Sequence, residues 1–295
     1  MSEDAWILFN AHPNRDRRIL NKLLKIFGSP DKILGLSTTS LARIPGVTNQ
    51  FAKDLLKQQE TFNLKAEKEL MSKRGVRFIP ITHPGYPTNL KTIASPPPAL
   101  YIKGEVLPED RFALAVVGSR RNTPYGKKAS REIVSKLSKS GLSIVSGLAR
   151  GIDALAHRFA LDSKGRTLAI LGNGLATCYP PENENLLQEI STQGAVCTEY
   201  PMKTPPKRKN FPERNGLIAG MSLGVLVVEA TIRSGSLITA RAALEENRSI
   251  YAVPGNMFKY SHQGTNALIR EGAQMVRSAE DILEDLSYIL RGMMK

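Results

Sequence analysis

Residues 112–120 read FALAVVGSR, and residues 142–157 read LSIVSGLARGIDALAH. Each is a short apolar run that ends at a glycine turn, and a stretch with apolar residues at helical spacing follows it. Continuous apolar strands separated by helices need crossover connections, which produce a parallel sheet buried on both faces. The pattern therefore predicts an α/β protein with a doubly wound, mostly parallel, Rossmann-like sheet.

The same alternation continues to the end of the chain, so we assign residues 111–295 to the Rossmann-like domain. Strands are predicted at 112–117, 142–146, 167–171, 195–198, 224–228, 249–253 and 274–276. Helices are predicted at 125–139, 152–161, 184–193, 212–219, 237–246 and 265–270.

Residues 1–75 have apolar residues at helical spacing with breaks at Gly28-Ser29-Pro30 and Pro45-Gly46, which predicts a small all-helical domain. Within it, residues 41–47 read LARIPGV, the form of a SAM-like or helix-hairpin-helix turn whose exposed N–H groups can hold a phosphate. A plain Pro-Gly helix break without a ligand fits these residues equally well.

Residues 76–110 are rich in proline and contain the apolar run Leu100-Tyr101-Ile102. We interpret this segment as a linker that covers the following domain and contributes one short strand.

The composition favours a polyanionic partner. The 295 residues carry 41 Lys+Arg against 27 Asp+Glu, a net charge of +14. The two cysteines, Cys178 and Cys197, cannot supply a four-ligand zinc site, so buried thiols and no metal are expected. No apolar run is long enough to cross a membrane and the first ten residues have no basic flank, so we expect a cytoplasmic protein with no membrane association.

Small and basic residues follow four of the predicted strands. Ligands of a doubly wound sheet bind outside the carboxyl ends of its strands, where glycine lets backbone N–H groups approach an anion. This pattern predicts a phosphate-binding edge, although tight strand-to-helix turns alone would also need glycine. The residues are Gly118-Ser119-Arg120, Gly147 with Arg150, Gly172-Asn173-Gly174, and Ser234-Gly235-Ser236.

A nucleotide cofactor is not expected. The glycine pair Gly172-x-Gly174 has Thr177 in place of a third glycine, and no acid follows the second strand to hold a ribose. A phosphate-binding G-x-x-x-x-G-K-[ST] loop is also missing from the sequence.

A basic cluster at residues 203–215 reads KTPPKRKNFPERN. Lys209 and Arg214 flank Phe211, and cations beside a ring on which a base can stack are typical of single-strand binding. A solvated basic loop anchored by its phenylalanine is the alternative.

Catalytic candidates are few. Asp153 and His157 stand four residues apart on one predicted helix, but an acid at a helix start more often bonds the exposed N–H groups there. We therefore expect a structural role for Asp153 and no catalytic residues.

Together these motifs resemble the DNA-processing protein A family, DprA, also called Smf, over about residues 75–286. The motifs are VGSR at 117–120, SGLARGIDA at 146–154, YPPEN at 179–183, NFP at 210–212 followed by Arg214-Asn215, SGSLITAR at 234–241 and VPG at 253–255. The resemblance implies a bacterial cytosolic homodimer without catalytic activity. Such a protein binds single-stranded DNA without sequence preference, protects it, and loads the RecA recombinase onto it in natural transformation.

The resemblance also implies particular site residues. Gly118-Ser119-Arg120 would form the phosphate pocket, and Lys209, Phe211, Arg214 and the adjoining Asn215 the basic-aromatic contact. Leu268 and Ile269 would lie at the dimer interface.

The chain departs from the family pattern at Gly216, where many members have a basic residue, and at Ala176, where an Asp often stands. Many members carry a C-terminal winged helix, and we expect none within the residues up to Lys295, which leave no room for one.

An enzyme is the rival class, because related Rossmann-like proteins hydrolyse nucleoside phosphates. Their P-G-G-x-G-T motif is absent from residues 229–236, which read EATIRSGS. We expect the binding protein.

Overall fold

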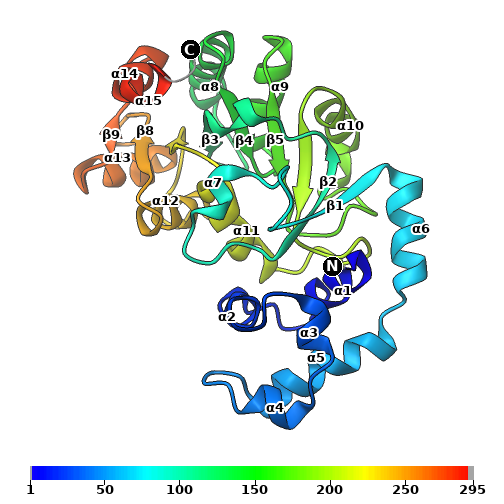
Figure 1. Ribbon diagram of the computed structural model, residues 1–295. Helices are drawn as coiled ribbons and strands as arrows, with labels where there is room; N and C mark the ends of the chain where they lie inside the picture. The colour runs from blue at the N-terminus through cyan, green and yellow to red at the C-terminus, as the bar shows by residue number, and fades with distance from the viewer. Residues whose placement is uncertain (1, 292–295) are drawn as a thin grey trace.

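A nine-stranded sheet forms the centre of the molecule in a computed structural model that describes residues 2–291 (Figure 1). The strand order is β1-β2-β6-β5-β4-β3-β7-β8-β9, and the strands from β6 to β9 run parallel. The strands are β1 (Val76–Pro80), β2 (Ala99–Gly104), β3 (Ala113–Val117), β4 (Ser143–Ser146), β5 (Thr167–Ile170), β6 (Ala195–Thr198), β7 (Gly224–Val227), β8 (Ser249–Ala252) and β9 (Gln274–Met275). The predicted doubly wound, mostly parallel α/β fold is confirmed.

Helices cover both faces of the sheet. The α-helices after β3 are α8 (Pro124–Lys139), α9 (Ile152–Asp162), α10 (Glu184–Gln193), α11 (Asn210–Gly220), α12 (Ser236–Glu245), α13 (Gln263–Arg270), α14 (Ala279–Asp285) and α15 (Ser287–Leu290). Figure 1 shows α8, α9 and α10 on one side and α11 and α12 on the other. Leu114 and Val116 of β3 pack toward α8 and α9, while Ala115 and Val117 pack toward α11 and α12. This alternation buries both faces, as the continuous apolar runs predicted.

The N-terminal region is helical, as expected. It contains α1 (Glu3–Asn10), α2 (Arg17–Phe27), α3 (Pro30–Leu34), α4 (Thr38–Ala42), α5 (Asn49–Thr61) and α6 (Leu64–Arg74). Asp16 caps α2 by accepting from the N–H groups of Arg18 and Ile19, and Gly28 ends it in the left-handed conformation. Trp6 and Ile7 of α1 pack against Tyr101 and Val196 of the sheet, so this region shares a core with the Rossmann-like part.

The segment 76–110 is more than the predicted linker with one strand. It supplies two strands, because β1 pairs antiparallel with β2, and β2 pairs antiparallel with β6. Between them lies α7 (Thr88–Lys91), and a short 3-10 turn (Pro108–Arg111) leads into β3. The sequence pattern missed β1 because Pro80 ends it, yet proline is tolerated at the end of an edge strand.

No helix in residues 2–291 is long and apolar enough to span a membrane.

Candidate nucleic-acid interface

A cleft of about 990 Å³ lies outside the carboxyl ends of β3 and β7. These strands are neighbours, and the chain winds away from them in opposite directions, to β4 on one side and β8 on the other. This is the topological switch point, where doubly wound sheets bind ligands. Its lining includes Gly118, Ser119, Arg120, Arg121, Tyr179, Arg208, Phe211, Arg214, Asn215, Ser234, Gly235, Ser236 and Tyr260.

The loop after β3 presents Arg120 to this cleft. The Ser119 N–H donates to the Glu229 carbonyl oxygen at 2.7 Å, and the Arg121 N–H donates to the Ser119 hydroxyl at 3.1 Å. One N–H group of the expected phosphate pocket, that of Ser119, and the N–H group of the adjoining Arg121 are therefore used within the protein. The exposed Arg120 side chain enters no ion pair among residues 2–291, so its guanidinium is available to an anion.

Glu229 holds this wall of the cleft in place. Its buried carboxylate accepts the Thr123 hydroxyl at 2.6 Å and the Thr123 N–H at 3.1 Å. Thr123 is the N-cap of α8. Glu229 thus couples the end of β7 to the start of the helix after β3.

The segment Ser234-Gly235-Ser236 forms the opposite wall at the start of α12. The hydroxyls of Ser234 and Ser236 are 2.7 Å apart, and the Asn215 amide donates to the Gly235 carbonyl oxygen at 3.3 Å. These bonds tie the loop after β7 to α11.

Two aromatic rings lie together on the cleft lining. The ring centroids of Tyr179 and Phe211 are 5.7 Å apart with their planes tilted by 42°. Tyr179 is exposed and Phe211 half-buried, so their ring faces are accessible to a flat ligand. Such faces accept nucleic-acid bases by stacking.

Arg214, which the sequence analysis expected to contact DNA, is buried more deeply than is usual for an arginine in an exposed phosphate-binding loop. It belongs to α11, is 4% exposed, and its Nη1 donates to the carbonyl oxygens of Gly147 and Ile170. Burial, opposed by Asp153 and assisted by Arg120, lowers the pKa of Arg214 to about 10. The Arg214 side chain therefore joins the ends of β4 and β5 while it lines the cleft floor.

Asp153 and His157 are close to this arginine, and Asp153 also lines the cleft. The Asp153 carboxylate accepts from the Gly147 N–H at 3.2 Å, so it bonds the loop after β4 and not the first N–H groups of α9 as predicted. Burial raises the pKa of Asp153, against the influence of Arg214. Burial and the Arg214 charge lower the pKa of His157 to about 3, so this imidazole is neutral.

The remaining glycine-rich strand ends support the cleft from behind and do not line it. A Cβ at Gly147 would overlap the Arg214 guanidinium, and a Cβ at Gly172 would lie 3.0 Å from the Phe211 ring. The Asn173 amide donates to the Gly174 carbonyl oxygen at 2.9 Å and to that of Thr177 at 2.8 Å.

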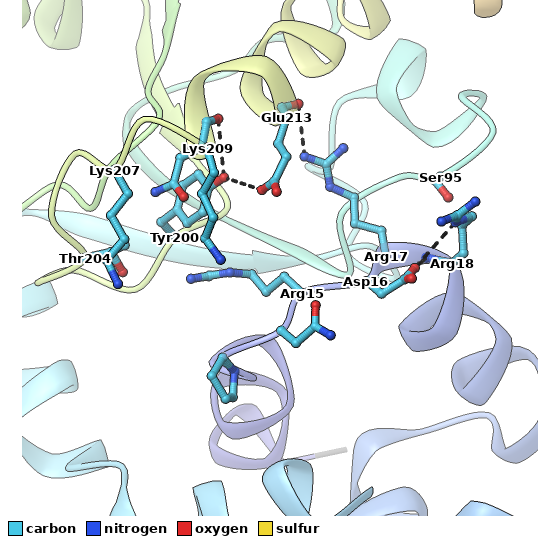
Figure 2. Close-up of a pocket in the computed structure, with 13 residues that line it drawn as sticks. Arg15, Asp16, Arg17, Arg18, Ser95, Tyr200, Thr204, Lys207, Lys209 and Glu213 are labelled. Atoms are coloured by element: carbon cyan, nitrogen blue, oxygen red, sulfur yellow. Dashed lines mark hydrogen bonds and ion pairs between the residues drawn. The ribbon is translucent and has the colours of Figure 1, made fainter. Parts of the chain in front are cut away.

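Two predicted basic residues point elsewhere. Arg150 is exposed and forms an ion pair with Glu182. Lys209 lines a separate groove that the N-terminal region helps to form, shown in Figure 2.

The two residues assigned to a dimer interface, Leu268 and Ile269, lie on α13 and are half-buried. Leu268 packs against the main core of its own chain, and neither residue lines the cleft.

Among the cleft-lining residues that the sequence analysis missed, four have cationic or aromatic side chains: Arg121, Tyr179, Arg208 and Tyr260. Arg208 was visible within the basic cluster, and Tyr179 within the YPPEN motif. Nothing local marked either side chain as facing the cleft.

The comparisons with known proteins agree with this fold. A family model described as DNA recombination-mediator protein A matches residues 77–287. The Smf protein of Escherichia coli is 44% identical over 212 residues, which is 72% of this chain and 57% of that protein. The DprA protein of Bacillus subtilis is 39% identical over 238 residues, 80% of each chain.

Two solved structures are also similar. The X-ray structure of DprA from Streptococcus pneumoniae has a TM-score of 0.83 and 34% identity, and the match covers 96% of this chain and 98% of that one. A DprA structure from Helicobacter pylori has a TM-score of 0.65 and 29% identity over 72% of this chain and 96% of that one. With its cleft at the sheet's switch point and a match over most of its length, the chain belongs to the DNA recombination-mediator protein A family, whose relatives are named DprA and Smf.

Proposed function

We propose that this protein binds single-stranded DNA in the cleft, without sequence preference and without catalysis. One observation carries the proposal: Arg120 and Arg208 line the same cleft as the paired rings of Tyr179 and Phe211. Guanidinium groups bind phosphates, and ring faces stack on any base. Neither contact reads base edges, so the binding should be indifferent to sequence.

The relatives support this assignment. The DprA structure from Helicobacter pylori is described as giving insight into a single-stranded DNA binding mode, and the matched family is described as a recombination mediator. We further propose that the protein acts in the cytoplasm, where it protects incoming DNA and loads RecA onto it during natural transformation or recombination.

The first test is a titration of wild-type protein with oligonucleotides of different sequence at several salt concentrations. Arg208→Ala should reduce the slope of log K against log salt by about 0.7, since one phosphate contact is lost. Phe211→Leu should weaken binding by about 1–3 kcal/mol and leave the slope nearly unchanged, because stacking releases no counterions. Equal slope losses in both variants would contradict this division of roles.

The rival function, hydrolysis of a nucleoside phosphate, is tested by incubation with nucleoside monophosphates. Release of free base by wild-type protein, abolished in Asp153→Asn, would replace the binding assignment with an enzymatic one.

We also propose a homodimer through α13. Leu268→Glu with Ile269→Glu should give a folded monomer by light scattering that binds short oligonucleotides normally. It should lose roughly 10²-fold in affinity for long ones, since two linked sites gain avidity. A variant that stays dimeric would refute this interface.

A further inference from the structure

A second hollow, of about 410 Å³, lies between the N-terminal region and the Rossmann-like part. Figure 2 shows the side chains that line it. One side comes from the residues just before and at the start of α2, and the other from the loop 204–209 and the start of α11. Its lining includes Asn14, Arg15, Asp16, Arg17, Arg18, Tyr200, Thr204, Lys207, Lys209 and Glu213. We call it the interdomain groove.

The loop 204–209 borders both the interdomain groove and the cleft, and successive residues from Pro206 to Lys209 alternate between them. Pro206 and Arg208 line the cleft, whereas Lys207 and Lys209 line the groove. The loop closes on itself where the Asn210 N–H donates to the Lys207 carbonyl oxygen at 2.9 Å. One short basic loop therefore carries cations on both of its sides.

Arg15 reaches the same groove from the N-terminal region. Its guanidinium lies 4.4 Å from the centroid of the Tyr200 ring, and Nη1 donates to the Glu199 carbonyl oxygen at 3.4 Å. Stacking on a ring holds a guanidinium in place without neutralising it. Figure 2 shows the side chains of Arg15, Lys207 and Lys209 extending into the same space.

The charges in the groove do not balance. Arg17 pairs with the buried Glu199, and Arg18 lies 3.6 Å from Asp16. Among residues 2–291, no carboxylate forms an ion pair with Arg15, Lys207 or Lys209.

The acid that remains in the groove, Glu213, accepts the Tyr200 hydroxyl at 2.9 Å. Beside the ion-paired groups, three cations without an ion pair thus share the groove with Glu213, a carboxylate that already has a hydrogen-bond partner.

We propose that a single strand bound in the cleft continues over the loop 204–209 into the interdomain groove, where Arg15, Lys207 and Lys209 bind its phosphates. This inference rests on the proposed function and extends it by giving the N-terminal region a direct part in DNA binding. It also gives Lys209 a place on the strand's path, although Lys209 does not line the cleft.

The groove is suited to the sugar-phosphate backbone and not to bases. Its aromatic ring, Tyr200, is 2% exposed beneath Arg15, so no ring face is open to stacking. Bases would be held in the cleft by Tyr179 and Phe211, and the strand's phosphates in the groove by cations alone.

The test compares two triple variants that lose the same charge. Arg15→Gln/Lys207→Ala/Lys209→Ala removes the groove cations. Lys53→Ala/Lys57→Ala/Lys65→Ala removes three exposed cations that line neither hollow. Both are titrated with a long oligo-thymidine and with one of about four nucleotides, near the smallest site that single-strand binding folds cover.

With the long strand, the groove variant should lose about 2 in the slope of log K against log salt, since three phosphate contacts at about 0.7 each are removed. Its affinity at about 0.1 M salt should fall roughly tenfold to a hundredfold. With the short oligonucleotide, both variants should bind like wild type. The control should also keep the wild-type slope for the long strand.

Equal losses in the two triple variants, or equal losses for short and long strands, would overturn the proposal, because either result means a general effect of charge. Should Arg15→Gln disturb the fold, Lys207→Ala/Lys209→Ala keeps Arg15 and should still lose about 1.4 in slope. A wild-type protein that binds no oligonucleotide would instead overturn the proposed function itself.

Discussion

Arg17 and Arg214 are both largely buried arginines, one beside the interdomain groove and the other on the floor of the cleft, yet their environments differ. Arg17 forms an ion pair with the carboxylate of Glu199, whose side chain is 3% exposed. Arg214 bonds two carbonyl oxygens, and its Nε has no hydrogen-bond partner among the described residues.

The pKa shifts of the two arginines are opposite. Burial alone would lower the pKa of Arg17, but Glu199 raises it above the ordinary value. The pKa of Arg214 falls, because its burial outweighs the opposing charge of Asp153. The comparison indicates that Arg17 fastens the N-terminal region to the sheet, whereas Arg214 keeps a charge that an anion in the cleft can satisfy.

The largest expected effect is on stability. Arg17→Met should lower the free energy of unfolding by about 3–5 kcal/mol, because it leaves the Glu199 carboxylate buried without its partner. Arg214→Met should cost less, about 1–3 kcal/mol, since carbonyl groups rather than a carboxylate lose their donor. Urea denaturation measures both.

Arg150→Met is the matched control for these variants, because it breaks an exposed Arg–Glu pair and should leave stability unchanged. If Arg214→Met lowered the free energy of unfolding more than Arg17→Met, the proposed difference between the two arginine environments would be wrong.

The next effect is on DNA binding at the cleft. Arg120→Ala should weaken single-strand binding by about 1.5–3 kcal/mol for all sequences alike, because a charge-assisted bond to phosphate is lost. Fluorescence anisotropy with labelled oligonucleotides measures the change. Arg77→Ala, an exposed arginine on the edge strand β1, serves as the control and should bind like wild type. A well-folded Arg120→Ala protein with unchanged affinity would exclude Arg120 from the site.

A smaller effect concerns acid stability and comes from Arg214's neighbour His157. Its Nδ1 lies 2.7 Å from the Thr167 hydroxyl, and its pKa falls from 6.5 to about 3 on folding. Below pH 6.5 the unfolded chain therefore binds a proton at His157 that the native state does not bind. The free energy of unfolding consequently decreases as the pH falls.

Between about pH 7 and pH 5 this linkage should cost about 2 kcal/mol, and His157→Gln should remove it. Urea denaturation of both proteins at the two pH values checks the difference. Identical pH dependence would show that His157 is protonated in the folded protein.

The sequence predicted most of the Rossmann-like part closely. The strand expected at 195–198 is β6 as observed, and the others in this part differ by a residue at one end. Local periodicity is sufficient for this, because a strand buried on both faces must be apolar throughout. Local periodicity did not predict β1, because its sequence is short and ends in proline. Only its pairing with β2 makes this segment a strand.

The sequence predicted the location of the candidate site, but the structure differs from the prediction in which elements carry some of its residues. The glycine and serine strand ends at 118–120 and 234–236 do line the cleft, because parallel strands all end at one edge of the sheet. Helix α11 begins at Asn210 rather than at the predicted residue 212, so Phe211 lies on this helix and not in the loop before it.

What the sequence determined by itself was therefore the parallel sheet, the edge at which its strands end and the kind of residue gathered there. Only the tertiary structure decided that Arg208 faces the cleft while its neighbours Lys207 and Lys209 face the groove, and that Arg15 joins them from nearly two hundred residues away. Hydrophobic periodicity is a local property of the chain. The direction of a charged side chain depends on how segments distant in sequence pack together, and no local pattern encodes that.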